Sequence, residues 1–189
     1  MLPAPHHRTT AEIEQRLDDV LASPQREGIL EAIFVRPRKN ERHALTAVAV
    51  TPDGGIEGDR WAYDHWQRLD DGRPDPNSQV TLMNVRMLKI VAVDKEAMCL
   101  AGDNLIVDLD LSEENLPVGS HLEIGDHVVL EITAESHTGC GAFARRYGLQ
   151  AREFVNSPRW KPLHLRGRYG RVIHGGTIQV GDTVRKINA

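Results

Sequence analysis

The chain has little cysteine, few aromatic residues and no long apolar run, and each shortage excludes a class of protein. Its 189 residues include two cysteines, too few for a disulfide framework, and a reducing compartment would leave both as thiols. No apolar stretch approaches the ~20 residues of a membrane-spanning helix. The N-terminus also lacks the apolar middle of a signal peptide. We therefore expect a cytoplasmic protein with no membrane partner.

Charge of one sign is not in large excess either. The formal net charge is -4 at pH 7, and aromatic residues make up only 5% of the chain. An acidic total without interleaved aromatic residues argues against a nucleic-acid partner. Neither a Gly-x-Ser-x-Gly motif nor a glycine-rich loop ending in Lys-Ser/Thr occurs, so serine-hydrolase and P-loop chemistry find no support in the sequence.

What is present is a succession of short β-type runs after one helix. A capping box at Thr9 and Glu12 opens an apolar helical face that ends at Ser23-Pro24, so residues 1–27 are expected to form an N-terminal helical extension. Helical patterns interrupt the rest at 85–98 and, as a short pair, within 142–156. The β-type runs lie at 29–35, 45–50, 79–83, 104–107, 121–124, 128–133, 169–174, 177–180 and 183–187. Residues 28–189 are thus predicted to form a mainly β, barrel-like domain with a few peripheral helices.

Turns and loops carry the next set of candidates. Residues 61–76 are polar and are expected to form an exposed loop or lid. The pair Gly-Asp recurs at 58–59, 102–103, 125–126 and 181–182. Turn chemistry is the default interpretation of such pairs. The pair before Arg60 is the expected exception, because Arg60 could bind an anion and the residues after it could stack on a planar ring. Those residues are Trp61, Tyr63, His65 and Trp66.

Cys140 is the leading candidate for a reactive group. The apolar run 128–133 delivers it into a turn with glycine on both sides, with His137 before it and Arg145 and Arg146 after it. A nearby imidazolium or guanidinium lowers the pKa of a thiol, so these three side chains are expected to activate it. The thiolate could then attack a persulfide or bind a soft metal ion. The alternative is an inert cysteine in a tight turn.

A basic segment from Lys161 to Arg171 is the second candidate. Its alternation would place Arg166, Arg168 and His164 on one face, where they could hold a phosphate or another acidic group. A solvated edge strand protected by charge is the alternative. A zinc or iron site could combine His137, Cys140, His164 and His174, although a second close ligand pair is missing. The other cysteine, Cys99, lies in an apolar run and is expected in the core.

Five motifs, in order, resemble the signature of the MOSC domain, which is found at the C-terminus of molybdenum cofactor sulfurases. They are Asp53 to Arg60, Gly102 to Val107, Leu116 to Gly119, Cys140 and Gly175 to Val184. The chain is similar to the small standalone members, since His137-Thr138-Gly139 replaces the Arg-x-Pro that precedes the cysteine in many others.

The resemblance implies a barrel-like fold that binds the molybdenum cofactor, a pterin dithiolene bearing a phosphate. Cys140 would be a sulfur (persulfide) carrier or a molybdenum ligand, with His137 beside it as a catalytic residue. The cofactor-binding residues would be Arg60, Asn104, Arg145, Arg146, Arg166 and Arg168.

The same resemblance indicates what the protein would work with. Fused sulfurases carry a pyridoxal-phosphate domain for which this chain has no room, so the expected partner is a sulfur donor such as a cysteine desulfurase, or a molybdoenzyme. Two alternatives stay open. One is a non-catalytic cofactor-binding or delivery module in which the thiol is incidental. The other is a cofactor-dependent reductase of N-hydroxylated compounds with an external reductant.

Overall fold

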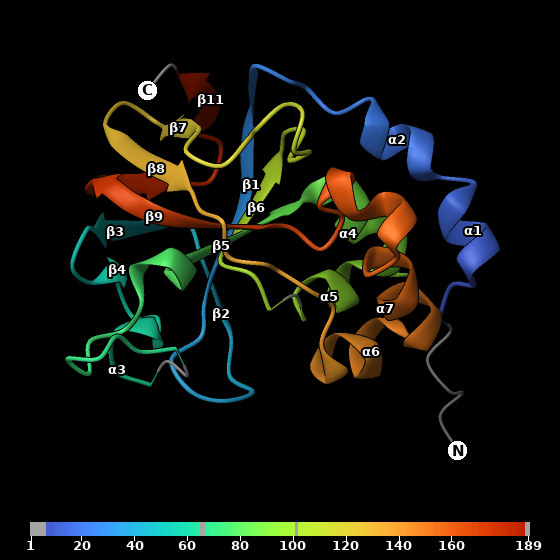
Figure 1. The fold of residues 1–189 in the computed structure, drawn as a ribbon, viewed down its shortest axis with the longest axis horizontal. Coiled ribbons are helices and arrows are strands. Elements are labelled where there is room, and N and C mark those ends of the chain that lie inside the picture. The colour runs from blue at the N-terminus through green and yellow to red at the C-terminus, as the bar shows by residue number, and fades with distance from the viewer. Residues whose placement is uncertain (1–6, 65–66, 101, 188–189) are drawn as a thin grey trace.

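The strands form a closed barrel, and most helices gather along one side of it (Figure 1). The structure, a computed structural model, describes residues 7–64, 67–100 and 102–187. Seven strands of this part make the ring: β1 (Glu27–Val35), β5 (Val80–Asn84), β6 (Leu105–Asp108), β7 (His121–Ile124), β8 (Val128–Ile132), β9 (Arg168–His174) and β11 (Thr183–Ile187). Their order is β11-β7-β8-β9-β5-β6-β1, and β11 pairs with β1 to close it. The predicted mainly β, barrel-like fold is confirmed.

A second, smaller sheet flanks the barrel. It contains β3 (Ala47–Thr51), β4 (Gly55–Ile56) and β10 (Gly176–Gln179), in the order β10-β3-β4. The run predicted at 45–50 is divided, because β2 (His43–Leu45) pairs with β1 and the chain then leaves the barrel to pair with β10. The other predicted runs each overlap one observed strand.

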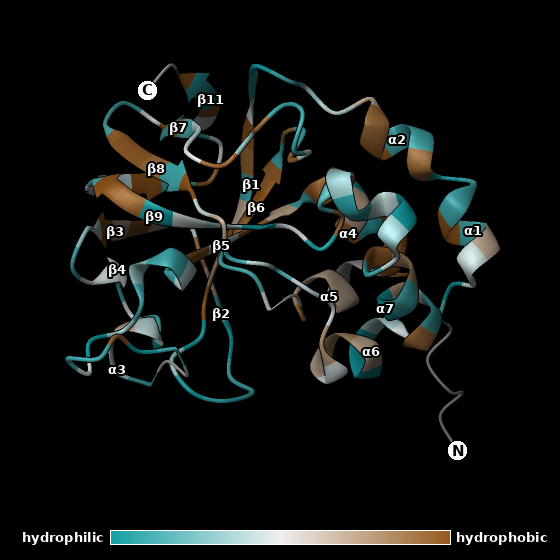
Figure 2. Cartoon of the chain, viewed as in Figure 1, coloured by the Kyte–Doolittle hydropathy of each residue, from teal (hydrophilic) through white to brown (hydrophobic). Residues whose placement is uncertain are grey.

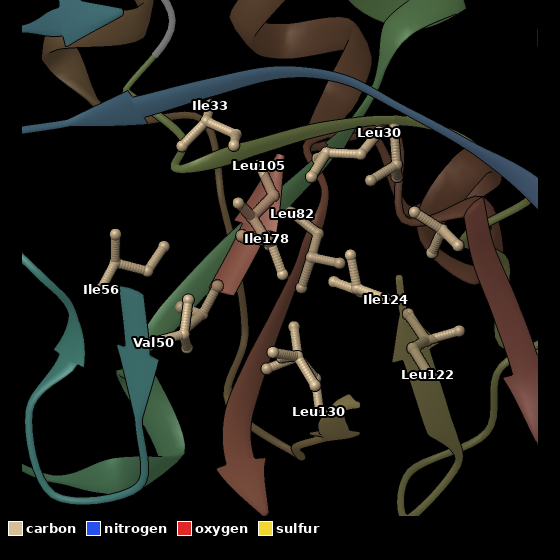
Figure 3. Close-up of a cluster of buried hydrophobic side chains, with 14 of the residues drawn as sticks. Leu30, Ile33, Val50, Ile56, Leu82, Leu105, Leu122, Ile124, Leu130 and Ile178 are labelled. Carbon is tan, nitrogen blue, oxygen red and sulfur yellow. The ribbon is translucent and has the colours of Figure 1, made fainter. Parts of the chain in front are cut away.

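The barrel strands separate two apolar clusters. Side chains such as Leu30, Ile33 and Leu82 meet inside the barrel (Figure 3). Met83 and Ile106 instead lie in the cluster formed with the helices. All five residues of β5 are buried, since both faces of that strand are covered. This double burial explains why β6 reads Leu-Ile-Val without alternation, and why the two polar side chains of β5, Thr81 and Asn84, are hydrogen-bonded inside the protein. Figure 2 shows hydrophobic residues along several barrel strands.

The helical layer is built from short segments. They are α1 (Thr10–Glu14), α2 (Leu17–Leu21), α4 (Val85–Val91), α5 (Lys95–Met98), α6 (Gly141–Tyr147), α7 (Leu149–Val155) and the 3-10 helix η2 (Pro158–Leu163). The predicted capping box is present at Thr9 and Glu12. Two predicted helices are each divided in two: the first breaks at Gln15 and Arg16, and the second breaks before α5. The predicted pair within 142–156 corresponds to α6 and α7.

Two findings concern the surface of the described residues. No helix among them is long and apolar enough to cross a membrane. Cys99, expected in the core, is exposed. The prediction was wrong because α5 ends at Met98, so Cys99 follows in a turn instead of continuing an apolar helical face.

Candidate functional site

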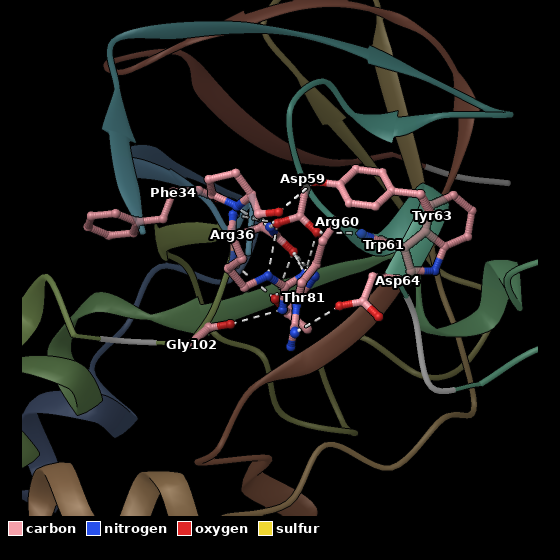
Figure 4. A network of polar contacts seen from close by, with 11 residues as sticks. Phe34, Arg36, Asp59, Arg60, Trp61, Tyr63, Asp64, Thr81 and Gly102 are labelled. Carbon is pink, nitrogen blue, oxygen red and sulfur yellow. Dashed lines mark hydrogen bonds and ion pairs between the residues drawn. The ribbon is translucent and has the colours of Figure 1, made fainter. Parts of the chain in front are cut away.

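A buried ion pair joins the end of β1 to the turn at Asp59 (Figure 4). Arg36 directly follows β1, and its Nε and Nη2 donate to the Asp59 carboxylate at 2.9 and 3.0 Å. The backbone N–H groups of Arg36 and Trp61 donate to the same carboxylate. Burial alone would raise the pKa of Asp59, but the hydrogen bonds and charge of Arg36 outweigh it and lower this pKa. Asp59 therefore stays ionised and fixes Arg36 in place.

Asn104 is the centre of the same network and is 0% exposed. Its Oδ1 accepts hydrogen bonds from Arg36 Nη2 at 2.9 Å and from Thr81 Oγ1 at 2.9 Å. Its Nδ2 donates to the Phe34 carbonyl at 3.2 Å and to Asp59 Oδ2 at 2.9 Å. Both polar atoms of the side chain are thus engaged by the protein. We assign Asn104 to the frame of the site rather than to direct contact with a ligand.

Several guanidinium groups gather around Gly102. The point where a Cβ on Gly102 would lie is 3.5 Å from Arg146 Nη1 and 3.8 Å from both Arg166 Nη2 and Arg42 Nη2. The pKa of Arg42 is lowered, first by burial and then by the charges of Arg146, Arg36 and Arg60. Carboxylates offset part of this positive charge, because Asp59 pairs with Arg36, Asp103 pairs with Arg166, and Asp64 lies 3.5 Å from Arg60. We call Arg36, Arg42, Arg60, Arg146 and Arg166 the arginine cluster.

Cys140 lies at the N-cap of α6 and is exposed. Partial burial of the thiol acts against ionisation. The backbone amides of Phe143 and Ala142, and then the charge of Arg166, act in the opposite direction and prevail, so the pKa of Cys140 lies below its usual value. A thiol that is both accessible and acidified is a competent nucleophile or metal ligand.

The backbone of Gly139, just before Cys140, is hydrogen-bonded to α7 and to Asn156, the residue that follows α7. Asn156 accepts from the Gly139 N–H at 2.7 Å and donates to its carbonyl at 2.9 Å. Arg152 Nε donates to the same carbonyl at 3.1 Å. A Cβ at position 139 would lie 3.0 Å from Val155 Cγ2, so any larger residue there would press on α7. These contacts set the position from which the thiol projects.

His137 lies in a buried setting with only 8% of its side chain exposed. Its ring packs against Tyr169 with centroids 4.7 Å apart. Arg166 Nη1 donates to both oxygens of Asp103 at 2.7 and 2.9 Å. Burial, followed by the charges of Arg166 and Arg36, lowers the pKa of His137 well below its usual value. His137 is therefore neutral at pH 7, and the charge that acidifies Cys140 comes from Arg166 instead of the predicted imidazolium.

The other predicted arginines lie in three different surroundings. Arg146 belongs to the arginine cluster, whereas Arg145 is exposed and its Nη1 lies 3.6 Å from the point where a Cβ on Gly141 would be. Arg168 is buried, and its charge acts on His164. Gly167, with φ +108°, turns the chain between Arg166 and Arg168 before β9 begins, and Arg166 pairs with Asp103 whereas the charge of Arg168 acts on His164.

The loop at 61–76 is anchored by its first aromatic residue. Trp61 is 3% exposed and its Nε1 donates to the Asp75 carbonyl at 3.2 Å, so it is not free to stack on a ligand as expected. Tyr63, on the one-turn helix α3 (Trp61–Asp64), is exposed (Figure 4). The loop continues into the 3-10 helix η1 (Pro76–Ser78). His65 and Trp66 lie outside the described residues.

The alternative zinc or iron site does not assemble. Among the described residues, no group of three His, Cys, Asp or Glu side chains is close enough to hold a metal ion. The four proposed ligands His137, Cys140, His164 and His174 therefore do not converge.

The Gly-Asp pairs divide into two kinds. Asp182 accepts from the Gln179 N–H within its own turn, which is turn chemistry. Asp59 and Asp103 are instead buried and paired with arginines distant in sequence. Sequence reasoning missed Arg36 and Arg42, although the basic run that follows β1 was a usable signal. It also missed Asn156, because no local sequence pattern indicates that this residue contacts Gly139.

Comparison with known proteins concerns the fold and the family. The profile of the MOSC domain matches residues 60–185. The crystal structure of the YuaD protein from Bacillus subtilis is similar with a TM-score of 0.58 and 16% identity, over 86% of this chain and 97% of that chain. YiiM from Escherichia coli gives 0.53 and 12%, over 85% and 70%. YiiM from Geobacillus stearothermophilus gives 0.50 and 14%, over 88% and 75%.

At these identities the structural likeness shows the fold alone. No curated protein sequence matches the chain significantly. The profile match extends over most of the chain, from Arg60 through Cys140 to the last strand of the barrel. The protein belongs to the MOSC domain family.

Proposed function

We propose that this protein binds an anionic, sulfur-bearing ligand of the molybdenum cofactor type, with Cys140 as persulfide carrier or molybdenum ligand. The observation that carries the proposal is the position of Arg166. Its Nη2 lies in the arginine cluster, 3.8 Å from the Cβ point of Gly102, and its charge also lowers the pKa of Cys140. One side chain thus links an anion-binding group of charges to an acidified thiol.

The residues present fit such a cofactor. Guanidinium groups bind phosphate through paired hydrogen bonds, and the arginine cluster offers several of them. A thiolate is a preferred ligand for a soft metal centre, and Cys140 is exposed with a lowered pKa. When bound, the molybdenum centre would supply the redox or sulfur chemistry. Arg36 and Asn104 would keep the buried network that supports the site in place, and Asn156 would fix the backbone just before Cys140.

The sulfur-carrier role needs a donor protein, for which a cysteine desulfurase has the right chemistry. The Cys140 thiolate would attack the outer sulfur of a donor persulfide, forming a new S–S bond while the donor leaves as a thiolate. Charge is conserved in this exchange, and the product is a persulfide on Cys140. The lowered pKa of the Cys140 thiol increases the share of the attacking thiolate at neutral pH.

The test is metal analysis and intact mass spectrometry of natively purified protein. Cys140→Ser should lose the bound molybdenum or the mass of the extra sulfur while remaining folded. Cys99→Ser is the matched control, because Cys99 is also an exposed thiol. Unchanged molybdenum and sulfur content in Cys140→Ser would refute the proposal.

A non-catalytic binding or delivery module is the second candidate. It is favoured by the arginine cluster, which could hold an anionic ligand without any thiol chemistry. In that case, alkylation of Cys140 would leave ligand binding intact and Arg146→Met would weaken it. Loss of binding on alkylation would instead favour the chemical role.

A further inference from the structure

An apolar groove of about 540 Å³ lies between the barrel and the helical layer, where β1 and β6 face α4 and α5 (Figure 1). Its floor consists of side chains from the buried cluster that barrel and helices share, such as Phe34, Leu88 and Ile106. Neither Cys140 nor a member of the arginine cluster belongs to the described lining. The groove is therefore separate from the candidate site.

The rim of the groove exposes large apolar side chains. Val93, which follows α4 and lines the groove, is 39% exposed. Leu100, next to the lining residue Cys99, is 46% exposed. Contact of such side chains with water is unfavourable, and exposed apolar side chains that border a groove mark an interaction site. The groove and its rim together offer an apolar surface to a partner.

The two walls of the groove carry charges of opposite sign. Lys89 lies on the helical wall, in α4, and Glu31 lies on the strand wall, in β1. Both side chains are exposed, and within the described part of the chain neither forms an ion pair. Asp94 also lines the helical wall, but its Oδ1 accepts from the Ala97 N–H at 2.7 Å. A partner with charge of one sign only would be repelled at one wall, whereas a surface with the same two charges in reverse order matches both.

We propose that this groove is the contact between two copies of the chain, related by a two-fold axis that runs along it. Such an axis places the helical wall of each copy over the strand wall of the other. Lys89 of one copy then pairs with Glu31 of the other, and the same pair forms a second time by symmetry. Val93 and Leu100 of each copy enter the groove of the other and lose their contact with water. This inference does not depend on the proposed function, because the contact leaves Cys140 and the arginine cluster uncovered.

The size of the groove limits the strength of the contact. Twelve described residues line it, whereas a standard interface takes ~20–30 residues from each partner. We therefore expect a dimer with a Kd of ~10 µM or weaker, in exchange with the monomer. Sedimentation velocity of the full chain over a concentration series, with reductant present, measures this equilibrium. A chain that stays monomeric up to ~200 µM overturns the inference, and so does growth into larger oligomers, because a two-fold contact closes at the dimer.

Charge reversal tests which residues meet. Lys89→Glu and Glu31→Lys should each weaken the dimer about tenfold, because symmetry replaces two attractive contacts by two repulsive ones. The double variant should recover the wild-type affinity to within about threefold, since opposite charges face each other again. Lys161→Glu and Glu57→Lys are the matched controls, because both residues are exposed and neither lines the groove. Reversals that weaken the dimer without recovery in the double variant, or controls that weaken it equally, would contradict the proposed pairing.

Cys99 supplies a second readout, because it lines the groove and is exposed in a single copy of the chain. In a Cys140→Ser background, alkylation of Cys99 by iodoacetamide should slow as the protein concentration rises and the dimer forms. The rate should stay constant when Lys89→Glu is added to that background. A constant rate in a sample that does dimerise would mean that the copies meet at another surface, and the inference would be wrong. If the chain is monomeric, native mass spectrometry shows whether a small apolar molecule fills the groove instead.

Discussion

Replacement of Asn104 by alanine tests whether the buried network is the frame of the site. Asn104 is 0% exposed, and its side chain hydrogen bonds to Arg36, Asp59, Thr81 and the Phe34 carbonyl. Alanine removes all of these contacts and leaves two charged groups partly unpartnered inside the protein. Arg36 and Asp59 still bind each other, which limits the damage.

The expected loss in the free energy of unfolding is ~3–5 kcal/mol. Hydrogen bonds to charged groups contribute ~1.5–3 kcal/mol each, and Asn104 makes two of them. Its neutral bonds add ~1 kcal/mol each, and partial relaxation offsets some of the sum. Asn115 offers a graded control, because its Nδ2 donates only to the backbone carbonyls of Gln25 and Asp110. Asn115→Ala should therefore lose only ~1–2 kcal/mol.

Urea denaturation followed by circular dichroism measures both variants. The midpoint should fall much further for Asn104→Ala than for Asn115→Ala, with an unchanged slope that shows the same surface being exposed. Equal losses in the two variants would mean that the charged partners add nothing. The reasoning about the frame would then be wrong.

Three further outcomes follow from local geometry. Gly167→Ala should lower the free energy of unfolding by ~3 kcal/mol in urea denaturation, because φ is +108° and a Cβ would clash with the Leu82 carbonyl oxygen. Gly181→Ala is the control: the space around Gly181 is open, so this variant should lose only ~1 kcal/mol. Burial, then a nearby arginine, lowers the pKa of His164 to about 4, so the unfolded chain binds its proton first as the pH falls from about 6.5. Stability should drop across that interval, and His164→Asn should lessen the drop by ~2 kcal/mol in melts at pH 7 and pH 4. In a Cys99→Ser background, alkylation of Cys140 by iodoacetamide should reach its half-maximal rate at a lower pH than a free cysteine does, and a midpoint at or above the free value would contradict the lowered pKa.

The strands of the barrel could be predicted from the sequence, but not which two strands pair to close it. The apolar run of β6 could be recognised because both faces of that strand are buried. The pairing of β11 with β1 joins the two ends of the domain, and no local pattern encodes it. The helix predicted at 85–98 was too long, because the chain leaves the helical path after α4.

The candidate site could likewise be predicted only where a local pattern in the sequence marks it. Glycine on both sides marked Cys140 as a turn residue, and that local signal is sufficient. Protonation of His137 was mispredicted, because burial is set by distant elements such as Tyr169. The contact of Asn156 with Gly139 is likewise a product of tertiary packing.

The thiol segment bridges two layers that differ in architecture. Arg152 of α7 binds the Gly139 carbonyl, while the pKa of Cys140 is lowered by the backbone amides of Phe143 and Ala142 and then by the charge of Arg166, at the entry to a barrel strand. A displacement of one layer against the other would therefore change the acidity and the aim of the sulfur together. The reactivity of Cys140 therefore depends on how the helical layer packs against the barrel. A partner that binds either layer would change the acidity of the thiol without contacting it.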